Sequence, residues 1–367
     1  MLRFNEFITE QMLSEGGNVF TGKTASIKLE YIGPTLEAYF AELKHIFPKK
    51  ASIFNAQHFH ALGSVGKKPI SGDIDLGIDA KDILDHEMSD KSMSDWGIDP
   101  KAVHLEFAKL EKRAKTSSPE QLLMKAFLKE LTLYINRHAP KLYCDEKKVT
   151  GGNIFGLYPQ LTNKGQDVGI GVQIDWMIGD LAWLKFSYHS AAYPVGSNVK
   201  GLHRTQLMLS AFQVANLSFN HVSGVKDKDT GIVIAHDPEN ALTELGNRLG
   251  FKITQADSED YYKLNKLLKA KMKPVVYSKL LDTYFKILDS TRADIPDDLQ
   301  SEWKKRKDRL GLTGKFLPSD SLLNEHIVRV GDKFRLLSHK GKNLGTFDTK
   351  EGAENHERQV NYFKSKG

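Results

Sequence analysis

Two aspartates with a single residue between them, in an apolar segment, constrain the fold of this chain more than any other feature. Residues 58–79 alternate apolar and polar side chains, most clearly from Ile74 to Ile78, and this period of two predicts short strands joined by a turn. Asp73 and Asp75 fall on the face opposite those isoleucines, with their Cα atoms about 6.6 Å apart. Both carboxylates can therefore approach the same metal ions, while the other face of the strand packs into a core.

A second strand that carries a carboxylate is predicted further along. Residues 168–178 form an apolar run around Asp175, and the turn-forming residues 163–165 separate it from an expected strand at 153–161. Burying an ionised aspartate without a partner is costly, so Asp175 in such a strand requires a cation. A metal shared with the upstream aspartates would supply it. The alternative is a strand-end residue that faces solvent.

Gly63 and Ser64 precede the aspartate strand by a short loop. Glycine lets backbone N–H groups approach a polyanion closely, and a serine hydroxyl can donate to a phosphate oxygen, although a Gly-Ser pair is also an ordinary turn. Asp79 shares the face of Asp73 but lies four residues beyond Asp75, about 13 Å further along the strand. We therefore expect Asp79 to cap the next helix rather than to bind the same metal.

A cluster of basic residues opens a predicted helix at residues 200–215. The N–H groups and the dipole of a helix N-terminus favour anions, and Lys200 and Arg204 would add positive charge, so this end of the helix is a candidate phosphate site. The alternative is a solvated basic first turn. We expect His203 to be a hydrogen-bonded polar residue, because activation of a hydroxyl by a metal needs no histidine.

These motifs resemble the signature of the DNA polymerase β nucleotidyltransferase superfamily, which includes poly(A) polymerases, tRNA-tailing enzymes and antibiotic or protein nucleotidylyltransferases. The resemblance covers residues 47–209. In that family the Gly-Ser pair engages a nucleoside triphosphate, three aspartates bind Mg²⁺ or Mn²⁺, and an acceptor hydroxyl attacks the α-phosphate. The positions in this sequence that match are Gly63, Ser64, Asp73, Asp75 and Asp175.

The resemblance implies an α/β (α+β) fold. It would consist of a polymerase β-like nucleotidyltransferase core with a mixed sheet, a helical second domain and a small C-terminal ββα unit. A chain of 367 residues is long enough for one large core with appendages. We expect the catalytic domain at residues 16–235, the helical domain at 236–315 and the ββα tail at 324–367, with strands at 327–338 and 344–347.

Several helix ends can be predicted from local signals. An N-cap side chain before a proline indicates helix starts at Asp99-Pro100, Ser118-Pro119 and Asp237-Pro238. Apolar spacing predicts a helix from Pro34 to Phe47, and Ser258-Glu259 is a further expected start.

The composition narrows the classes of protein. The net charge of +6 and the pI of about 9.0 favour an anionic partner such as RNA or nucleotide phosphates, although a basic surface alone would give the same values. The single cysteine, Cys144, excludes an internal disulfide and a cysteine-rich zinc site. No apolar run approaches the roughly 20 residues that span a bilayer, so we expect a soluble protein without a membrane partner.

The two ends of the chain resemble segments of phage proteins. Residues 1–15 have the amphipathic spacing of a helix and are similar to capsid-targeting leaders of internal head proteins, with Leu13-Ser14-Glu15 as the cleavage motif and Glu15 as the last residue removed. The C-terminal ββα tail also recurs on phage proteins. These likenesses imply a bacteriophage protein in the host cytoplasm or in the phage head, with capsid, scaffold and prohead protease as partners. The alternative is an ordinary exposed N-terminal helix.

Three functions follow as hypotheses. The first is a nucleotidyltransferase that moves a nucleoside monophosphate from an NTP to an RNA 3′ end or to a host-protein side chain. The second is a non-catalytic head or binding protein that retains the fold, which predicts an incomplete set of aspartates. The third is a metal phosphohydrolase, which usually enlists histidines, and no histidine clusters with the aspartates in the sequence.

Overall fold

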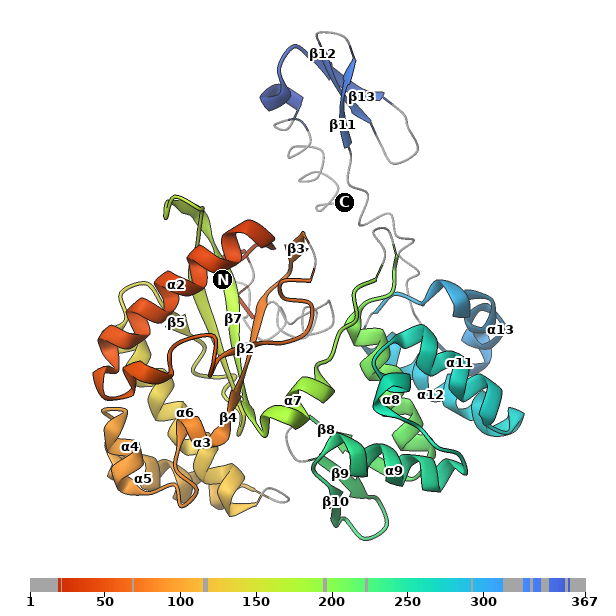
Figure 1. Ribbon diagram of the computed structural model, residues 1–367, viewed down its shortest axis with the longest axis horizontal. Helices are drawn as coiled ribbons and strands as arrows, with labels where there is room; N and C mark the ends of the chain where they lie inside the picture. The colour runs from red at the N-terminus through yellow and green to blue at the C-terminus, as the bar shows by residue number, and fades with distance from the viewer. Residues whose placement is uncertain are drawn as a thin grey trace. The chain divides into compact units, whose positions relative to one another are not determined.

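The computed structural model describes residues 19–20, 22–67, 69–114, 118–193, 197–221, 224–291, 293–312, 326–330, 333–337, 343–353 and 356 (Figure 1). The chain divides into two compact units, residues 1–313 and residues 314–367. The expected leader at residues 1–15, with its cleavage site at Glu15, lies outside the described residues. None of the helices within the described ranges combines the length and apolar character that crossing a membrane requires.

A five-stranded mixed sheet forms the centre of the first unit. Its strands, in spatial order, are β2 (His60–Ala61), β4 (Ile74–Asp79), β7 (Asp167–Gly179), β6 (Asn153–Leu161) and β5 (Tyr143–Cys144). β4 and β7 run parallel, and each of the other neighbouring pairs is antiparallel. A short antiparallel pair, β1 (Ile27–Lys28) with β3 (Ile70–Ser71), lies outside this sheet. The fold is therefore mixed α/β with a mixed sheet, as expected at that level.

The β6–β7 hairpin forms where the sequence predicts it. β6 alternates between buried and partly buried side chains along its whole length, which is the pattern of a strand with one face against the core. The predicted turn at residues 163–165 connects the strands, with Gly165 at a φ of +70°. β7 is exposed near this turn and buried from Val172 to Gly179, where it becomes the central strand of the sheet.

One face of the sheet is covered by helices that share its core. They are α2 (Leu29–Ile46), η1 (Pro48–Ile53), α3 (Ala80–Ile83), α4 (Asp90–Asp95), α5 (Pro100–Glu111) and α6 (Pro119–His138). Two of the three predicted starts before proline lie here and are confirmed, because the Asp99 and Ser118 side chains cap α5 and α6. The predicted start at Pro34 is wrong: α2 begins at Leu29 and contains the proline as its sixth residue.

Trp176 shows which face of β7 packs into this core. Its indole is buried against Phe54 and Phe59, and its Nε1–H donates to the Tyr39 hydroxyl on α2 at 2.6 Å. Side chains alternate across a strand, so Asp175 faces the other side of the sheet.

A second hydrophobic core extends from Trp183 to Trp303. Its elements, from green to blue in Figure 1, are α7 (Leu181–Ser187), α8 (Gly201–Val214), β8 (Leu217–Asn220), β9 (Gly224–Asp227), β10 (Val233–Ala235), α9 (Pro238–Leu249), α10 (Gln255–Ser258), α11 (Tyr261–Lys271), α12 (Pro274–Ser290), η2 (Asp297–Leu299) and α13 (Gln300–Leu310). This core starts well before residue 236. The antiparallel sheet β10–β9–β8 was not predicted.

Two local predictions in this region have opposite outcomes. Asp237 caps α9 at the predicted Asp237-Pro238 start. The expected start at Ser258-Glu259 is wrong, because Ser258 ends α10 and the Asp260 side chain caps α11 two residues later.

The second compact unit contains an antiparallel sheet of β11 (His326–Val330), β12 (Lys333–Leu337) and β13 (Asn343–Phe347). The single strand expected at residues 327–338 is wrong, because β11 and β12 are two separate strands that pair with each other. The helix of the expected ββα tail, from Lys350 to Lys364, is described at residues 350–353 and 356.

Candidate metal centre

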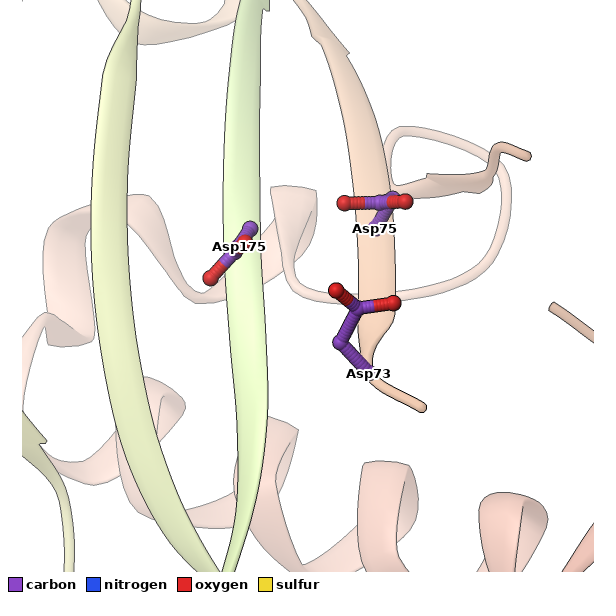
Figure 2. Close-up of side chains that lie close together, drawn as sticks. All are labelled: Asp73, Asp75 and Asp175. Atoms are coloured by element: carbon purple, nitrogen blue, oxygen red, sulfur yellow. The ribbon is translucent and has the colours of Figure 1, made fainter. Parts of the chain in front are cut away.

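Three carboxylates from two adjacent strands meet on the face of the central sheet opposite Trp176. Asp73 immediately precedes β4, Asp75 is its second residue, and Asp175 lies within β7. Asp75 and Asp175 are register partners across the parallel pair. One carboxylate oxygen of each aspartate lies within 4.8 Å of the others, and Figure 2 shows all three side chains on the same side of the two strands. The structure thus assembles the cluster that the sequence predicts.

Burial leaves these carboxylates without enough protein partners. Asp73 is 8% exposed and Asp175 is 3% exposed. Asp73 Oδ2 and Asp175 Oδ1 are buried and have no hydrogen-bond partner within the described part of the chain. An uncompensated buried carboxylate is expensive, and three of them repel one another as well. The cluster therefore needs a positive charge to be ionised.

The pKa values of all three carboxyl groups are raised. Burial raises the pKa of Asp73 to about 6. Burial, followed by the charge of Asp73, holds the pKa of Asp75 well above its ordinary value. The pKa of Asp175 is raised by burial and then by the charges of Asp75 and Asp73, and a hydrogen bond from Gln173 opposes that shift. A bound cation would reverse these shifts, because it favours the ionised carboxylates.

The donor atoms of the cluster fit a hard cation. Three carboxylates offer oxygen ligands, which Mg²⁺, Mn²⁺ and Ca²⁺ prefer, and no histidine or cysteine belongs to the group among the described residues. The orphaned oxygens of Asp73 and Asp175 give such an ion direct contacts to make. These residues can therefore bind a metal ion.

Asp79, at the other end of β4, has a structural role. Its side chain accepts a hydrogen bond from the backbone N–H of Lys81 and caps α3, as predicted. Asp79 therefore has a role of its own, although it lies on the same strand as Asp75.

Gly63 lies directly against the cluster. It has a φ of +58°, and a Cβ atom at this position would lie 3.2 Å from Asp75 Oδ2. The preceding residue, Leu62, donates its N–H to the Asp75 carbonyl at 2.9 Å, and Gly63 N–H donates to the Tyr188 carbonyl at 3.1 Å. Ser64 follows in a turn, and its carbonyl accepts a hydrogen bond from the Lys67 N–H at 3.1 Å. The Gly-Ser loop and the carboxylates therefore form one local structure.

The structure places Lys200 and Arg204 in contacts with other protein groups, and only Lys200 keeps some exposure. Arg204 is fully buried, where its Nε and Nη1 donate to the carbonyls of Ser258 and Phe186 at 2.6 and 2.8 Å. Lys200 lies 3.6 Å from Asp294 as an ion pair, with 14% of its side chain exposed. The expected phosphate contact is therefore wrong for Arg204, because its guanidinium satisfies interior carbonyl groups. For Lys200, the ion pair with Asp294 competes with the expected phosphate contact.

His203 is the buried polar residue that the sequence predicts. Its Nδ1 accepts from the Lys200 N–H at 2.8 Å, and its Nε2 lies 2.8 Å from the Asp294 carbonyl. A ring that accepts at one nitrogen and donates at the other is neutral. Burial lowers the pKa of His203 to about 4, which agrees with this hydrogen-bond pattern.

Two residues beside the carboxylates were missed by the sequence reasoning. Gln173 is 2% exposed, and its Nε2 donates to Asp175 Oδ2 at 2.7 Å. Tyr188 is partly buried, and burial together with the charge of Asp75 raises its phenol pKa. The period of two could have identified Gln173, because residues 173 and 175 share a face of their strand. Tyr188 belongs to a loop and had no such signal.

The assignment of a function rests on the geometry of the site. No protein-family model matches the chain, and a search of curated proteins finds no match.

Proposed function

We propose that this protein is a metal-dependent nucleotidyltransferase of the DNA polymerase β type. It would transfer a nucleoside monophosphate from an NTP to an acceptor hydroxyl. The observation that carries the proposal is the convergence of Asp73, Asp75 and Asp175 on one side of a mixed sheet, with the Gly63 backbone against the Asp75 carboxylate. The motifs also occur along the chain in the order typical of that superfamily, and this resemblance further supports the proposal.

The three aspartates would hold Mg²⁺ or Mn²⁺. When bound, a pair of such ions neutralises the charge of the triphosphate and favours deprotonation of the attacking hydroxyl. Phosphoryl transfer asks little covalent chemistry of the protein, so the remaining task of the chain is to position the substrate. Gly63 keeps a side chain out of the space beside Asp75, and the Ser64 hydroxyl can donate to a phosphate oxygen.

Two acceptors fit this chemistry. The net charge of +6 favours an RNA 3′ end, because a basic surface attracts a polyanion. A protein hydroxyl fits a phage protein that modifies its host, which is the context that the N-terminal resemblance implies.

The two rival functions make different predictions about this site. A non-catalytic protein that retains the fold would be expected to lose at least one carboxylate, whereas all three are present and close together. A metal phosphohydrolase usually adds histidines, and the described metal-ligand group contains aspartates alone. Both observations support the transferase.

The test is a labelling experiment that separates the fates of two phosphates. Each NTP, labelled either at the α- or at the γ-phosphate, is incubated with the protein, Mg²⁺ or Mn²⁺, and an RNA oligonucleotide or bacterial lysate. Nucleotidyl transfer attaches the α-label to RNA or protein and releases the γ-label as pyrophosphate. An oligonucleotide with a blocked 3′ end identifies RNA tailing. Release of inorganic phosphate without attachment of the α-label would instead indicate a hydrolase, and no reaction with any acceptor would favour the non-catalytic reading.

A further inference from the structure

A buried glutamine connects the carboxylate cluster to the N-terminal part of the described chain. Gln173 Nε2 donates to Asp175 Oδ2 at 2.7 Å, and Gln173 Oε1 accepts from the Val19 backbone N–H at 2.6 Å. Gln173 is 2% exposed, so water does not replace either bond easily. The three residues form a relay from a backbone amide to a candidate metal ligand.

The orientation of the Gln173 amide follows from this relay. A backbone N–H can only donate, so Val19 requires the oxygen of the amide on its side. The NH₂ group of Gln173 must then face Asp175, where it can donate to one carboxylate oxygen. The other oxygen, Asp175 Oδ1, has no hydrogen-bond partner within the described residues and remains for a cation.

The segment that contains Val19 is itself attached to β7. Gly171 N–H donates to the Lys23 carbonyl, and Ala25 N–H donates to the Gly171 carbonyl, both at 3.0 Å. A Cβ atom at residue 171 would lie 3.0 Å from the Lys23 carbonyl oxygen, so glycine permits this close approach. Gln160, on β6, secures the same segment by donating to the Ala25 carbonyl at 2.8 Å.

We infer that Gln173 is a positioning residue for the metal centre, and that the backbone N–H of Val19 holds its amide in the productive orientation. The inference rests on the proposed metal site. Groups that orient a metal ligand through a hydrogen bond typically contribute about 10–100-fold to metal affinity. Residues 19–20 and 22–25 are thereby part of the proposed metal centre, although they contribute no ligand.

The experiment compares three substitutions in the full-length chain by Mn²⁺ binding, measured by calorimetry and by the Mn²⁺ electron paramagnetic resonance signal. Gln173→Met keeps the size of the side chain and removes both hydrogen bonds. Val19→Pro removes the N–H and leaves Gln173 in place. Gln160→Met is the matched control, because this buried glutamine holds the same segment and does not contact a carboxylate.

We expect Gln173→Met to weaken Mn²⁺ binding about 10–100-fold, Val19→Pro to weaken it by a smaller factor, and Gln160→Met to leave it unchanged. Thermal unfolding should show lower stability for both glutamine variants. A Gln173→Met protein that binds Mn²⁺ like the wild type would overturn the inference and leave the proposed function standing. Equal losses in all three variants would also overturn it, because they would reflect loosening of the segment.

Two further outcomes also test the inference. If Gln173→Met does not fold, the comparison of Val19→Pro with Gln160→Met decides, and equal Mn²⁺ affinities in those two variants would contradict the inference. If the wild type itself binds no Mn²⁺, both the metal site and the positioning role fail together.

Discussion

Asp75 and Asp175 are register partners on the parallel strands β4 and β7, although residues 76–174 lie between them in the sequence. Neighbouring strands lie about 4.8 Å apart, and paired residues point to the same face, so this register brings the two carboxylates together. A shift of one residue would turn Asp175 into the aromatic core and bring Trp176 out of it. The burial of Trp176 therefore secures the register that forms the candidate metal centre.

Gly63→Ala should damage the metal centre through Asp75. A left-handed φ costs a residue with a Cβ about 1–2 kcal/mol, and the new methyl group would lie 3.2 Å from Asp75 Oδ2. We expect lower thermal stability and weaker Mn²⁺ binding.

Gly66→Ala provides the control for that substitution. Gly66 also has a positive φ, +74°, but a Cβ atom there would have no heavy atom within 4 Å. The stability of the Gly66→Ala protein should fall by an amount similar to that of Gly63→Ala, while its Mn²⁺ affinity stays at the wild-type value. Equal metal affinities in the two variants would show that Gly63 does not support the carboxylate.

The metal-free protein should become less stable as the pH rises. The folded-state pKa of Asp73 is about 6, above its ordinary 3.8, so the folded state disfavours the ionised form. The penalty is absent below about pH 4 and grows as the pH rises through 6, and the raised pKa values of Asp75 and Asp175 extend it further. Asp73→Asn should therefore raise stability by about 1–3 kcal/mol at pH 8 in a chelator.

Thermal unfolding at pH 5 and pH 8, with EDTA or with Mg²⁺, checks this sign. Mg²⁺ should stabilise the wild type more than Asp73→Asn, because the variant has lost a ligand. Asp95→Asn is the control, since Asp95 forms only a partly exposed ion pair with Lys49. A destabilised Asp73→Asn protein in EDTA at pH 8 would contradict the electrostatic account.

Arg204→Met should reduce stability and leave nucleotide affinity unchanged. The substitution leaves the carbonyls of Phe186 and Ser258 without their guanidinium donor, and an unsatisfied buried polar group costs about 1–3 kcal/mol. Equilibrium denaturation and NTP binding to the folded protein measure the two effects separately. A large loss of NTP affinity at unchanged stability would restore the phosphate-binding role that the sequence indicated.

His203→Gln should make the protein less sensitive to acid. The folded pKa of His203 is about 4, below its ordinary 6.5, so its contribution to stability is complete above about pH 6.5 and is lost as the pH falls towards 4. The full range corresponds to about 3 kcal/mol. Denaturation midpoints between pH 7 and pH 4 should fall less steeply in the variant than in the wild type. Parallel curves for the two proteins would contradict the buried neutral histidine.

Much of the fold could be predicted from local sequence signals, whereas the pairing of the short strands could not. The caps at Asp99, Ser118 and Asp237 and the turn at residues 163–165 depend on a few neighbouring residues, and each is confirmed. Pro34 was mistaken for a helix start because proline is favoured in the first turn of a helix, whereas α2 begins at Leu29 and contains Pro34 as its sixth residue. The sheet β8–β9–β10 was missed because its strands are short and their pairing carries no local signal.

The candidate site likewise contains residues whose role the sequence predicted and residues whose role it did not. The period of two put Asp73 and Asp75 on one face, and the cost of burying a lone carboxylate pointed to Asp175 as their partner, which the parallel register now explains. The charge of Arg204 suggested a ligand, but charge alone cannot reveal that a guanidinium is enclosed by the carbonyls of two other segments.

The most direct measurement is transfer of the α-phosphate label by Asp75→Asn and Asp175→Asn, compared with Asp79→Asn. Asp79 lies on the same strand as Asp75, and asparagine also caps helices well, so this control changes the same functional group without touching the cluster. The account predicts label transfer by the wild type and by Asp79→Asn, and loss of at least about a hundredfold in the other two, all with wild-type circular dichroism. Full transfer by a folded Asp75→Asn or Asp175→Asn protein would contradict the assignment of this cluster as the catalytic metal centre.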